Sequence, residues 1–411
     1  MKNFRKMIDA AKGDAPSDLI LKGGSIVDVF SGEILQSDIA IFDGVIVGVG
    51  AYNKGREIVD VEGKWIVPGL IDGHFHVESS MMTPHELAAS LLIHGTTTLV
   101  SDPHEIANVM GLEGVRFMIE ESKRVPFDIF YMAPSCVPAT HLETSGAVLK
   151  ASDLMSLKDE KSVLGLAEVM NFPGILSGME ELLKKIVLFR DDVIDGHCPG
   201  LKGNDLQAYL TVGIRSDHEI SEPSEAAEKL RSGMMIMIRE GTSAKNLEAI
   251  LPIVNKKNER RFCFVADDLH PEDIKRRGHL DYTLKKAVKK GLDTTSAIRM
   301  VTLNPSEYFG LNSTLDPDLD AVFQEYYQLL ALRKRNVEQA KRLAELKSRL
   351  DQFRVFGSSR RERLALEAVD QYLAKEPQLV SLDDRKDLKD ETQRKVSEMW
   401  SKIRTKRETA K

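Results

Sequence analysis

Eight short apolar segments, separated by longer amphipathic stretches, recur between residues 67 and 268 and constrain the fold more than any other feature. An apolar run followed by a stretch of helical periodicity is the pattern of a β-α unit. Eight such units predict an α/β fold, a (β/α)8 TIM-like barrel with parallel strands inside and helices outside. The expected strands are residues 67–77, 95–105, 127–135, 163–170, 192–198, 210–218, 234–240 and 262–268.

The segments on either side of this barrel, expected over residues 67–311, differ from it in composition. Residues 1–66 begin with a short helical stretch and continue with Val- and Ile-rich runs broken by Gly and Asp-Gly. They predict a small β-sandwich-like domain of several antiparallel strands. In residues 312–411, which are highly charged, apolar residues recur at three- and four-residue spacing after Asp316-Pro317. This pattern predicts an α-helical, coiled-coil-like tail.

The composition excludes several classes of protein. The 411 residues carry a net charge of −6, so we expect no basic surface for nucleic acid. No run of eighteen apolar residues exists and the N-terminus lacks a long apolar core, so we expect no membrane span and no signal peptide. The three cysteines, Cys136, Cys198 and Cys263, are far apart and odd in number. They fit a reducing compartment and predict a cytoplasmic location.

Histidines and carboxylates end six of the eight expected strands. In a barrel of this kind the active site lies at the C-terminal ends of the strands, where polar side chains can face a common opening. We therefore expect these residues to lie close together. They are His74, His76, Asp102, His104, Glu168, His197, His218 and Asp267.

These residue types suit divalent metal ions, which accept imidazole nitrogens and carboxylate oxygens. In His74-Phe75-His76 the two imidazoles lie on one face of a strand and are placed to bind one ion. Glu168 ends an apolar run and would be costly to bury without a partner such as two bridged metals. Asp267 is the expected acid and base that moves a proton from water to a leaving group. The predicted metal ligands are His74, His76, Glu168, His197, His218 and Asp267.

Several strings in the chain resemble the adenine deaminases of the amidohydrolase superfamily. They include VPGLIDGHFHVESS, GTTTLVSDPHEIANVMG, APSCVPATHLETSGA, GLAEVMNFPGI and DGHCPGLKG, and the resemblance covers about residues 1–311. It implies hydrolysis of free adenine to hypoxanthine and ammonia in purine salvage, with two Mn²⁺ or Fe²⁺ ions. It also implies that Glu168 stands where related enzymes use a carbamylated lysine. Asp102 and His104 would either assist proton transfer or bind a second metal.

Loops that follow barrel strands shape specificity, so they supply the candidate substrate contacts. Glu78 and Ser79 follow the HxH motif, and Thr140 and Glu143 lie after the third strand. We expect these four residues to face the purine, although packing or turn formation is an equal alternative for any one of them.

The resemblance ends near residue 311. Family members continue with strands that return to the N-terminal domain, and the glycine-rich segment that opens this return is not found here. A natural fusion, a rearranged gene or an artificial chimera would each explain the helical tail. The tail would bind a partner or form a homo-oligomer, or be a solvated helix without function.

Three functions therefore stay open: adenine deaminase, another cyclic amidohydrolase, or an impaired barrel that acts as a scaffold through its tail. The HxE…PCxxC pattern of zinc deaminases that act on nucleic acids is absent. Free adenine is accordingly the favoured substrate.

Overall fold

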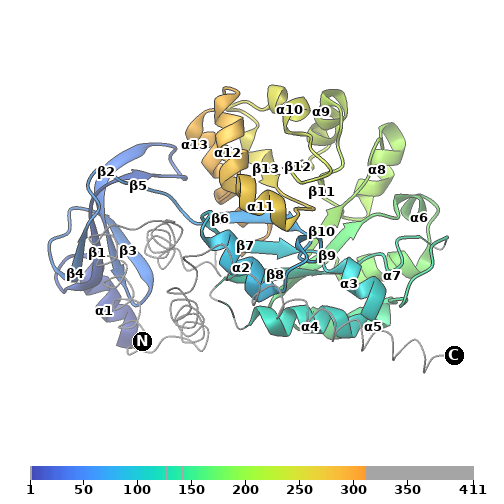
Figure 1. The fold of residues 1–411 in the computed structure, drawn as a ribbon, viewed down its shortest axis with the longest axis horizontal. Coiled ribbons are helices and arrows are strands. Elements are labelled where there is room, and N and C mark those ends of the chain that lie inside the picture. The colour runs from blue at the N-terminus through green and yellow to red at the C-terminus, as the bar shows by residue number, and fades with distance from the viewer. Residues whose placement is uncertain (1, 124, 126, 141, 312–411) are drawn as a thin grey trace, which may run out of the picture.

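The computed structural model describes residues 2–311 except 124, 126 and 141. An N-terminal sheet precedes a barrel of parallel strands with helices around it (Figure 1). The predicted helical tail, residues 312–411, lies outside the described residues. Within the described ranges, no helix is both long enough and apolar enough to cross a membrane.

The barrel contains eight strands, and each lies within a segment that the sequence predicts. β6 to β10 form one parallel sheet and β11 to β13 form another. Arg215 donates its backbone N–H to the carbonyl of Ile194 at 3.2 Å, between the two sheets. A parallel bridge between Phe75 and Asp267 joins β6 to the end of β13. The predicted (β/α)8 barrel is confirmed, with strands β6 (Leu70–Phe75), β7 (Thr96–Ser101), β8 (Asp128–Ala133), β9 (Val163–Val169), β10 (Val193–Gly196), β11 (Ser216–Asp217), β12 (Met235–Arg239) and β13 (Phe262–Val265).

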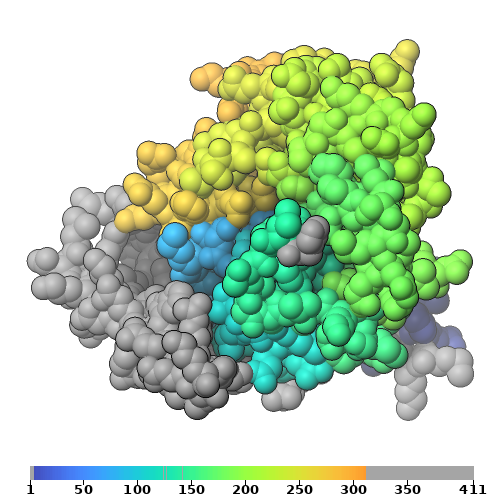
Figure 2. Space-filling model, turned by 90° about the vertical axis from the view of Figure 1, so that its right-hand side faces the viewer, coloured from blue at the N-terminus to red at the C-terminus, as the bar shows by residue number. Residues whose placement is uncertain are grey.

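Helices cover the outside of this barrel (Figure 1). The first units (blue) and the last units (yellow to orange) lie side by side in the space-filling view, as closure of the barrel requires (Figure 2). The helices are α2 (Pro84–Leu92), α3 (His104–Met110), α4 (Leu112–Ser122), α5 (Ala151–Lys158), α6 (Phe172–Leu176), α7 (Glu180–Leu188), α8 (Gly203–Thr211), α9 (Pro223–Arg231), α10 (Leu247–Ile250), α11 (Pro271–Arg277), α12 (Leu280–Lys289), α13 (Thr294–Arg299) and α14 (Leu303–Tyr308).

The sixth strand is much shorter than the sequence predicts. The expected strand began at residue 210, but Leu210 and Thr211 form the end of α8. Leu206 and Leu210 are both buried and lie four residues apart, on one face of that helix. Gly213, with φ of 108°, follows the helix, and only then does the chain enter β11. The apolar run therefore belongs to two elements.

The N-terminal sheet has the order β3-β2-β1-β4, with β5 also paired to β1. β1 and β2 are antiparallel, as are β2 and β3, which a tight turn at Asp43-Gly44 connects. The expectation of antiparallel strands is wrong for β4 and β5, which run parallel to β1. The chain crosses to the other side of β1 before β4 forms, and α1 (Lys2–Ala11) packs near β2 and β3. The strands are β1 (Ser17–Val27), β2 (Ile34–Phe42), β3 (Val45–Gly50), β4 (Gly55–Asp60) and β5 (Trp65–Ile66).

Alternating side chains of β12 and β13 pack in two different clusters, and this alternation places Arg239 and Asp267. In β12, Met235 and Met237 belong to a buried cluster that also contains Cys263 and Val265 of β13. Their neighbours Ile236, Ile238, Phe262 and Phe264 belong to the larger core cluster instead. Because side chains alternate between the two faces of a strand, Arg239 and Asp267 take the next positions on the interior side.

Candidate metal centre

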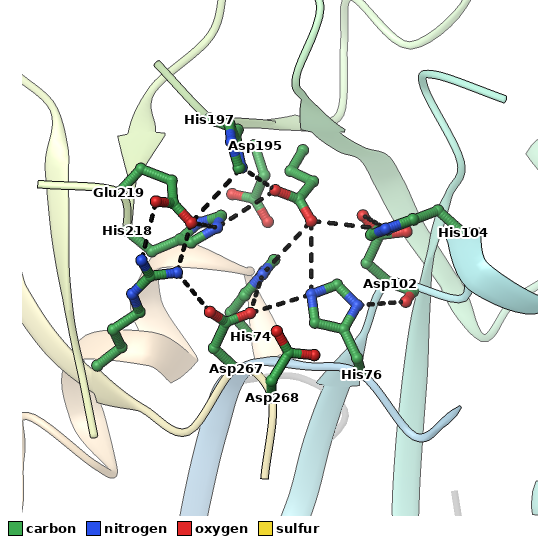
Figure 3. Close-up of polar contacts among 12 residues, drawn as sticks. His74, His76, Asp102, His104, Asp195, His197, His218, Glu219, Asp267 and Asp268 are labelled. Atoms are coloured by element: carbon green, nitrogen blue, oxygen red, sulfur yellow. Dashed lines mark hydrogen bonds and ion pairs between the residues drawn. The ribbon is translucent and has the colours of Figure 1, made fainter. Parts of the chain in front are cut away.

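The eight histidines and carboxylates predicted at the strand ends form one cluster at the mouth of the barrel (Figure 3). Six of them are at most 3% exposed, whereas His104 and His197 are half-buried. Each comes from the end of a strand or from the residues just after it: β6 supplies His74 and His76, β7 Asp102 and His104, β9 Glu168, β10 His197, β11 His218 and β13 Asp267.

Glu168 lies at the centre of this cluster and separates the histidines into two sets. Its Oε1 lies 3.8 Å from His74 Nε2, 3.4 Å from His76 Nε2 and 3.6 Å from His104 Nδ1. Its Oε2 lies 2.5 Å from His197 Nδ1 and 3.2 Å from His218 Nε2. Burial alone would raise the pKa of Glu168, but His218 and His197 hold this pKa well below its usual value. The carboxylate is therefore ionised and faces both sets.

Asp267 closes the barrel and faces the cluster at the same time. Its backbone has a positive φ of 60°, which Asp tolerates better than most residues. Its Oδ1 lies 3.5 Å from His74 Nε2 and 3.1 Å from His76 Nε2. Burial opposes ionisation of Asp267, yet the two histidines hold its pKa far below the usual range. Burial would likewise lower the pKa of His74, but Asp267 and Glu168 raise it to about 9.

The orientation of His76 is fixed by the backbone. Its Nδ1 lies 3.0 Å from the carbonyl oxygen of Asp102. A carbonyl only accepts hydrogen bonds, so Nδ1 carries the proton and donates it. In the neutral ring Nε2 then has a free lone pair directed at Glu168 and Asp267. Metal-ligating histidines commonly have this second hydrogen bond to a carbonyl or carboxylate.

Several buried polar atoms of the cluster have no hydrogen-bond partner within the described part of the chain. They are His74 Nε2, His104 Nδ1, His218 Nδ1 and both carboxylate oxygens of Asp102. Buried polar atoms are almost always satisfied, and an ion is one of the few explanations for an exception. Ligand atoms of His74, His76 and Glu168 lie within 4.8 Å of one another, as do those of Glu168, His197 and His218. The donor set therefore fits divalent metal ions.

Three residues of the cluster's surroundings are not among those predicted from the sequence. Arg239 Nη1 lies 2.5 Å from Asp267 Oδ2, and its Nη2 donates to Glu219 Oε2 at 2.8 Å. Glu105 Oε2 lies 3.3 Å from His76 Nδ1. Glu105 and Glu219 each directly follow a predicted histidine, and Arg239 ends the apolar run of β12. These positions in the sequence could have been used to predict the three residues.

The candidate substrate contacts fall into two groups. Glu78 accepts a hydrogen bond from the backbone N–H of Ile106 at 3.0 Å, and burial together with Glu105 raises its pKa to about 8. Ser79 donates to Asp268, next to Asp267 at the barrel mouth (Figure 3).

Thr140 and Glu143 lie elsewhere, in the loop after β8. The Thr140 hydroxyl donates to Glu143 Oε1 at 3.2 Å, and this contact is exposed to solvent. These contacts join the two residues to each other and not to the cluster, and the roles of all four candidates stay predictions.

A family model described as the amidohydrolase family matches residues 65–321, a range that contains the whole cluster. The chain belongs to the amidohydrolase family. The match confirms the resemblance to the amidohydrolase superfamily that the sequence shows. Family membership and the donor set together indicate that this amidohydrolase binds divalent metal.

The amidohydrolase is also similar to curated relatives named adenine deaminase. It is 49% identical over 308 residues to that of Desulfatibacillum aliphaticivorans, an alignment that covers 74% of this chain and 54% of the relative. It is 50% identical over 310 residues to that of Clostridium acetobutylicum, covering 75% of this chain and 54% of the relative. The chain thus spans about half the length of the curated relatives it matches.

Solved structures with this fold are more distant in sequence. A β-aspartyl dipeptidase from Fervidobacterium islandicum matches with a TM-score of 0.52 and 17% identity, over 72% of this chain and 87% of that one. A dihydroorotase matches with a TM-score of 0.53 and 17% identity, over 74% of this chain and 86% of that one. These two similarities support the fold of the amidohydrolase only.

Proposed function

We propose that this amidohydrolase converts free adenine to hypoxanthine and ammonia with two divalent ions, Mn²⁺ or Fe²⁺, at the cluster. The observation that carries the proposal is the central place of Glu168, whose two oxygens face separate sets of histidines. Relatives named adenine deaminase, about half identical over the matched residues, support adenine as the substrate. The substrate is thus a small molecule. We also propose that the reaction takes place in the cytoplasm.

Each ion would have its own ligands and share Glu168. His74, His76 and Asp267 would hold one ion, and His197 and His218 would hold the other. When bound, such ions lower the pKa of a coordinated water to roughly 7 and stabilise negative charge. The donor types fit both Mn²⁺ and Fe²⁺.

The protein's own contribution to the chemistry is the movement of protons. In the net reaction a water oxygen forms a bond to C6 of adenine, and the bond from C6 to the exocyclic nitrogen breaks. Arg239 binds Oδ2 of Asp267, so Oδ1, which faces His74 and His76, would be the oxygen that takes a proton from the water. Asp267 would return this proton to the departing nitrogen, which leaves as ammonia. Asp102 and His104, 3.3 Å apart, form a second pair suited to proton transfer.

Substrate contacts would come from the loops at the barrel mouth. Glu78 and Ser79 lie beside the cluster and are proposed to face the purine ring. Thr140 and Glu143, whose mutual contact is exposed, are proposed to face the purine from the loop after β8.

The direct test is adenine turnover by the purified chain, loaded with Mn²⁺ under reducing conditions. Ultraviolet absorbance would follow adenine, and a separate assay would follow ammonia. We expect hypoxanthine and ammonia in equal amounts, abolished by Asp267→Asn and unaffected by Asp159→Asn at the exposed end of α5. Metal content is measured in every sample. A folded, metal-loaded chain that leaves adenine unchanged would contradict the proposal and favour another cyclic substrate.

A further inference from the structure

Lys229 of α9 is completely buried, and the proposed reaction assigns it no role. Its Nζ donates to Asp217 Oδ2 at 2.5 Å, to Glu225 Oε1 at 2.5 Å and to the carbonyl oxygen of Cys198 at 2.7 Å. Burial of an ammonium group is costly unless the charge is paired and hydrogen-bonded. All three N–H groups of the Lys229 ammonium have an acceptor, so the charge is buried within a complete hydrogen-bond network.

The network fixes the backbone beside His197. Cys198 directly follows this histidine, and both of its backbone polar groups are bound. The carbonyl accepts from Lys229, and the N–H donates to Asp217 Oδ1 at 3.2 Å. Glu225 extends the support, because its Oε1 accepts from the N–H of Gly200 at 2.8 Å. The segment that carries His197 is thus tied to α9 at two points.

The same network fixes the backbone beside His218. Asp217 directly precedes this histidine at the end of β11. Its Oδ1 accepts a hydrogen bond from the N–H of Glu219 at 3.1 Å, which spans His218, while its Oδ2 binds Lys229. The Lys229–Asp217 ion pair therefore binds the backbone next to both His197 and His218.

The other half of the cluster has a separate support. Asp72 Oδ1 accepts from the N–H of His74 at 3.1 Å, and Asp72 Oδ2 accepts from the N–H of Ala266 at 3.0 Å. His279 Nε2 lies 2.9 Å from Asp72 Oδ2, and both side chains are fully buried. This second buried pair ties β6 to the segment that carries Asp267.

We propose that Lys229 is a positioning residue for one metal of the pair, the ion held by Glu168, His197 and His218. Lys229 acts through the backbone of Cys198 and the carboxylate of Asp217. The Asp72–His279 pair would position the ligands of the other ion, which are His74, His76 and Asp267. This inference rests on the two-metal site of the proposed function. Supporting residues of this kind change metal affinity by roughly 10- to 100-fold when they are replaced.

The test is a calorimetric titration of the metal-free full chain with Co²⁺, whose visible spectrum also reports the coordination of each ion. We expect Lys229→Met to weaken one of two equivalents of Co²⁺ by roughly 10- to 100-fold and to leave the other unchanged. Glu225→Gln keeps the Lys229–Asp217 pair and should weaken the same equivalent to a smaller extent. It serves as the informative variant if Lys229→Met does not fold.

His279→Gln is the matched variant on the other support and should weaken the other equivalent. Equal weakening of both equivalents by Lys229→Met would show a general structural role and overturn the proposal, as would unchanged binding in both α9 variants. Binding of a single Co²⁺ by the unsubstituted chain would overturn it too. A chain that binds two Co²⁺ ions with the expected selectivity but does not deaminate adenine would refute the proposed function and leave this inference standing.

Discussion

Asp267 contacts His74 through both its backbone and its side chain. Its N–H donates to the His74 carbonyl at 3.0 Å, and its Oδ1 lies 3.5 Å from His74 Nε2. The neighbouring bridge from Asp267 to Phe75 joins the last strand of the barrel to the first. The same residue therefore belongs both to the barrel closure and to the candidate metal centre, so we predict that metal binding and barrel closure are coupled.

This coupling predicts a large effect of metal removal on stability. Without an ion, the buried carboxylates and imidazoles keep atoms that lack partners, such as His74 Nε2. An ion that binds only the folded state stabilises it by mass action, by about 2.7 kcal/mol at a hundred times its Kd. We expect the thermal midpoint of the chelator-treated protein to fall below that of the Mn²⁺-loaded protein and to recover on reloading. Equal midpoints in both states would argue against metal binding at the cluster.

Replacement of Glu168 should affect both ions. Glu168→Gln keeps the shape of the side chain but removes the charge that faces both histidine sets. We expect metal content below one ion per chain and loss of the proposed turnover, measured by elemental analysis and the adenine assay. Glu180→Gln on α7, where the carboxylate is 84% exposed, is the control and should retain full metal content. Full occupancy in Glu168→Gln would rule out a bridging role.

Arg239 is predicted to orient Asp267 through the geometry of its guanidinium group. One side chain binds both Asp267 and Glu219, and a lysine, with a single ammonium, does not reproduce this fork. Arg239→Lys should lower kcat of the proposed reaction by about 10- to 100-fold with little change in metal content. Steady-state kinetics beside elemental analysis would check this. A loss of metal in proportion to the loss of activity would instead make Arg239 a support of the ion.

Much of the candidate site could be predicted from the sequence because its residues end apolar runs. His74, Glu168 and Asp267 stand where a buried strand reaches the barrel mouth, and their roles as ligands stay predictions. Arg239 could not be found in this way. Its partners Glu219 and Asp267 are 20 and 28 residues away in the chain, so the contacts exist only in the closed barrel.

The limits of the fold prediction have a similar cause. Apolar alternation indicates that a strand exists, but it does not say which neighbour the strand pairs with. β4 therefore pairs parallel to β1 although its sequence resembles that of the antiparallel strands. The predicted start of the strand at residues 210–218 was wrong for a different reason. Leu210 is equally suited to the buried face of α8, and it belongs to that helix.

Gly165 is predicted to be essential for the position of Glu168. A Cβ at this residue of β9 would lie 1.9 Å from the carbonyl oxygen of Val193, its partner in β10. Gly165→Ala must therefore push these strands apart, three residues before Glu168. We expect a lower thermal midpoint and weaker metal binding. Gly50→Ala, where the new Cβ would meet only Tyr52 at 3.7 Å, is the control and should behave like the unsubstituted protein. Normal metal binding by Gly165→Ala would show that the barrel adjusts at no cost to the site.

Asp38 gives the N-terminal sheet a stability that depends on pH. Its carboxylate accepts from Lys22 Nζ at 2.8 Å and from the N–H groups of Gly23 at 3.0 Å and Tyr52 at 3.1 Å. Burial opposes ionisation, but these hydrogen bonds, led by that of Lys22, lower the pKa of Asp38. The stabilisation is therefore complete above the unfolded pKa of about 3.9 and is lost as the pH falls through the lower folded pKa.

We accordingly expect Asp38→Asn to reduce the free energy of unfolding by about 1–3 kcal/mol at neutral pH. The difference from the unsubstituted protein should shrink as the pH falls below about 4, because the carboxyl group of the latter then becomes neutral as well. Urea unfolding over a pH series, followed by far-ultraviolet circular dichroism, measures both quantities. A difference that stays constant down to the lowest pH would show that hydrogen-bond geometry, and not the charge of Asp38, stabilises the irregularity of β1 at Gly23.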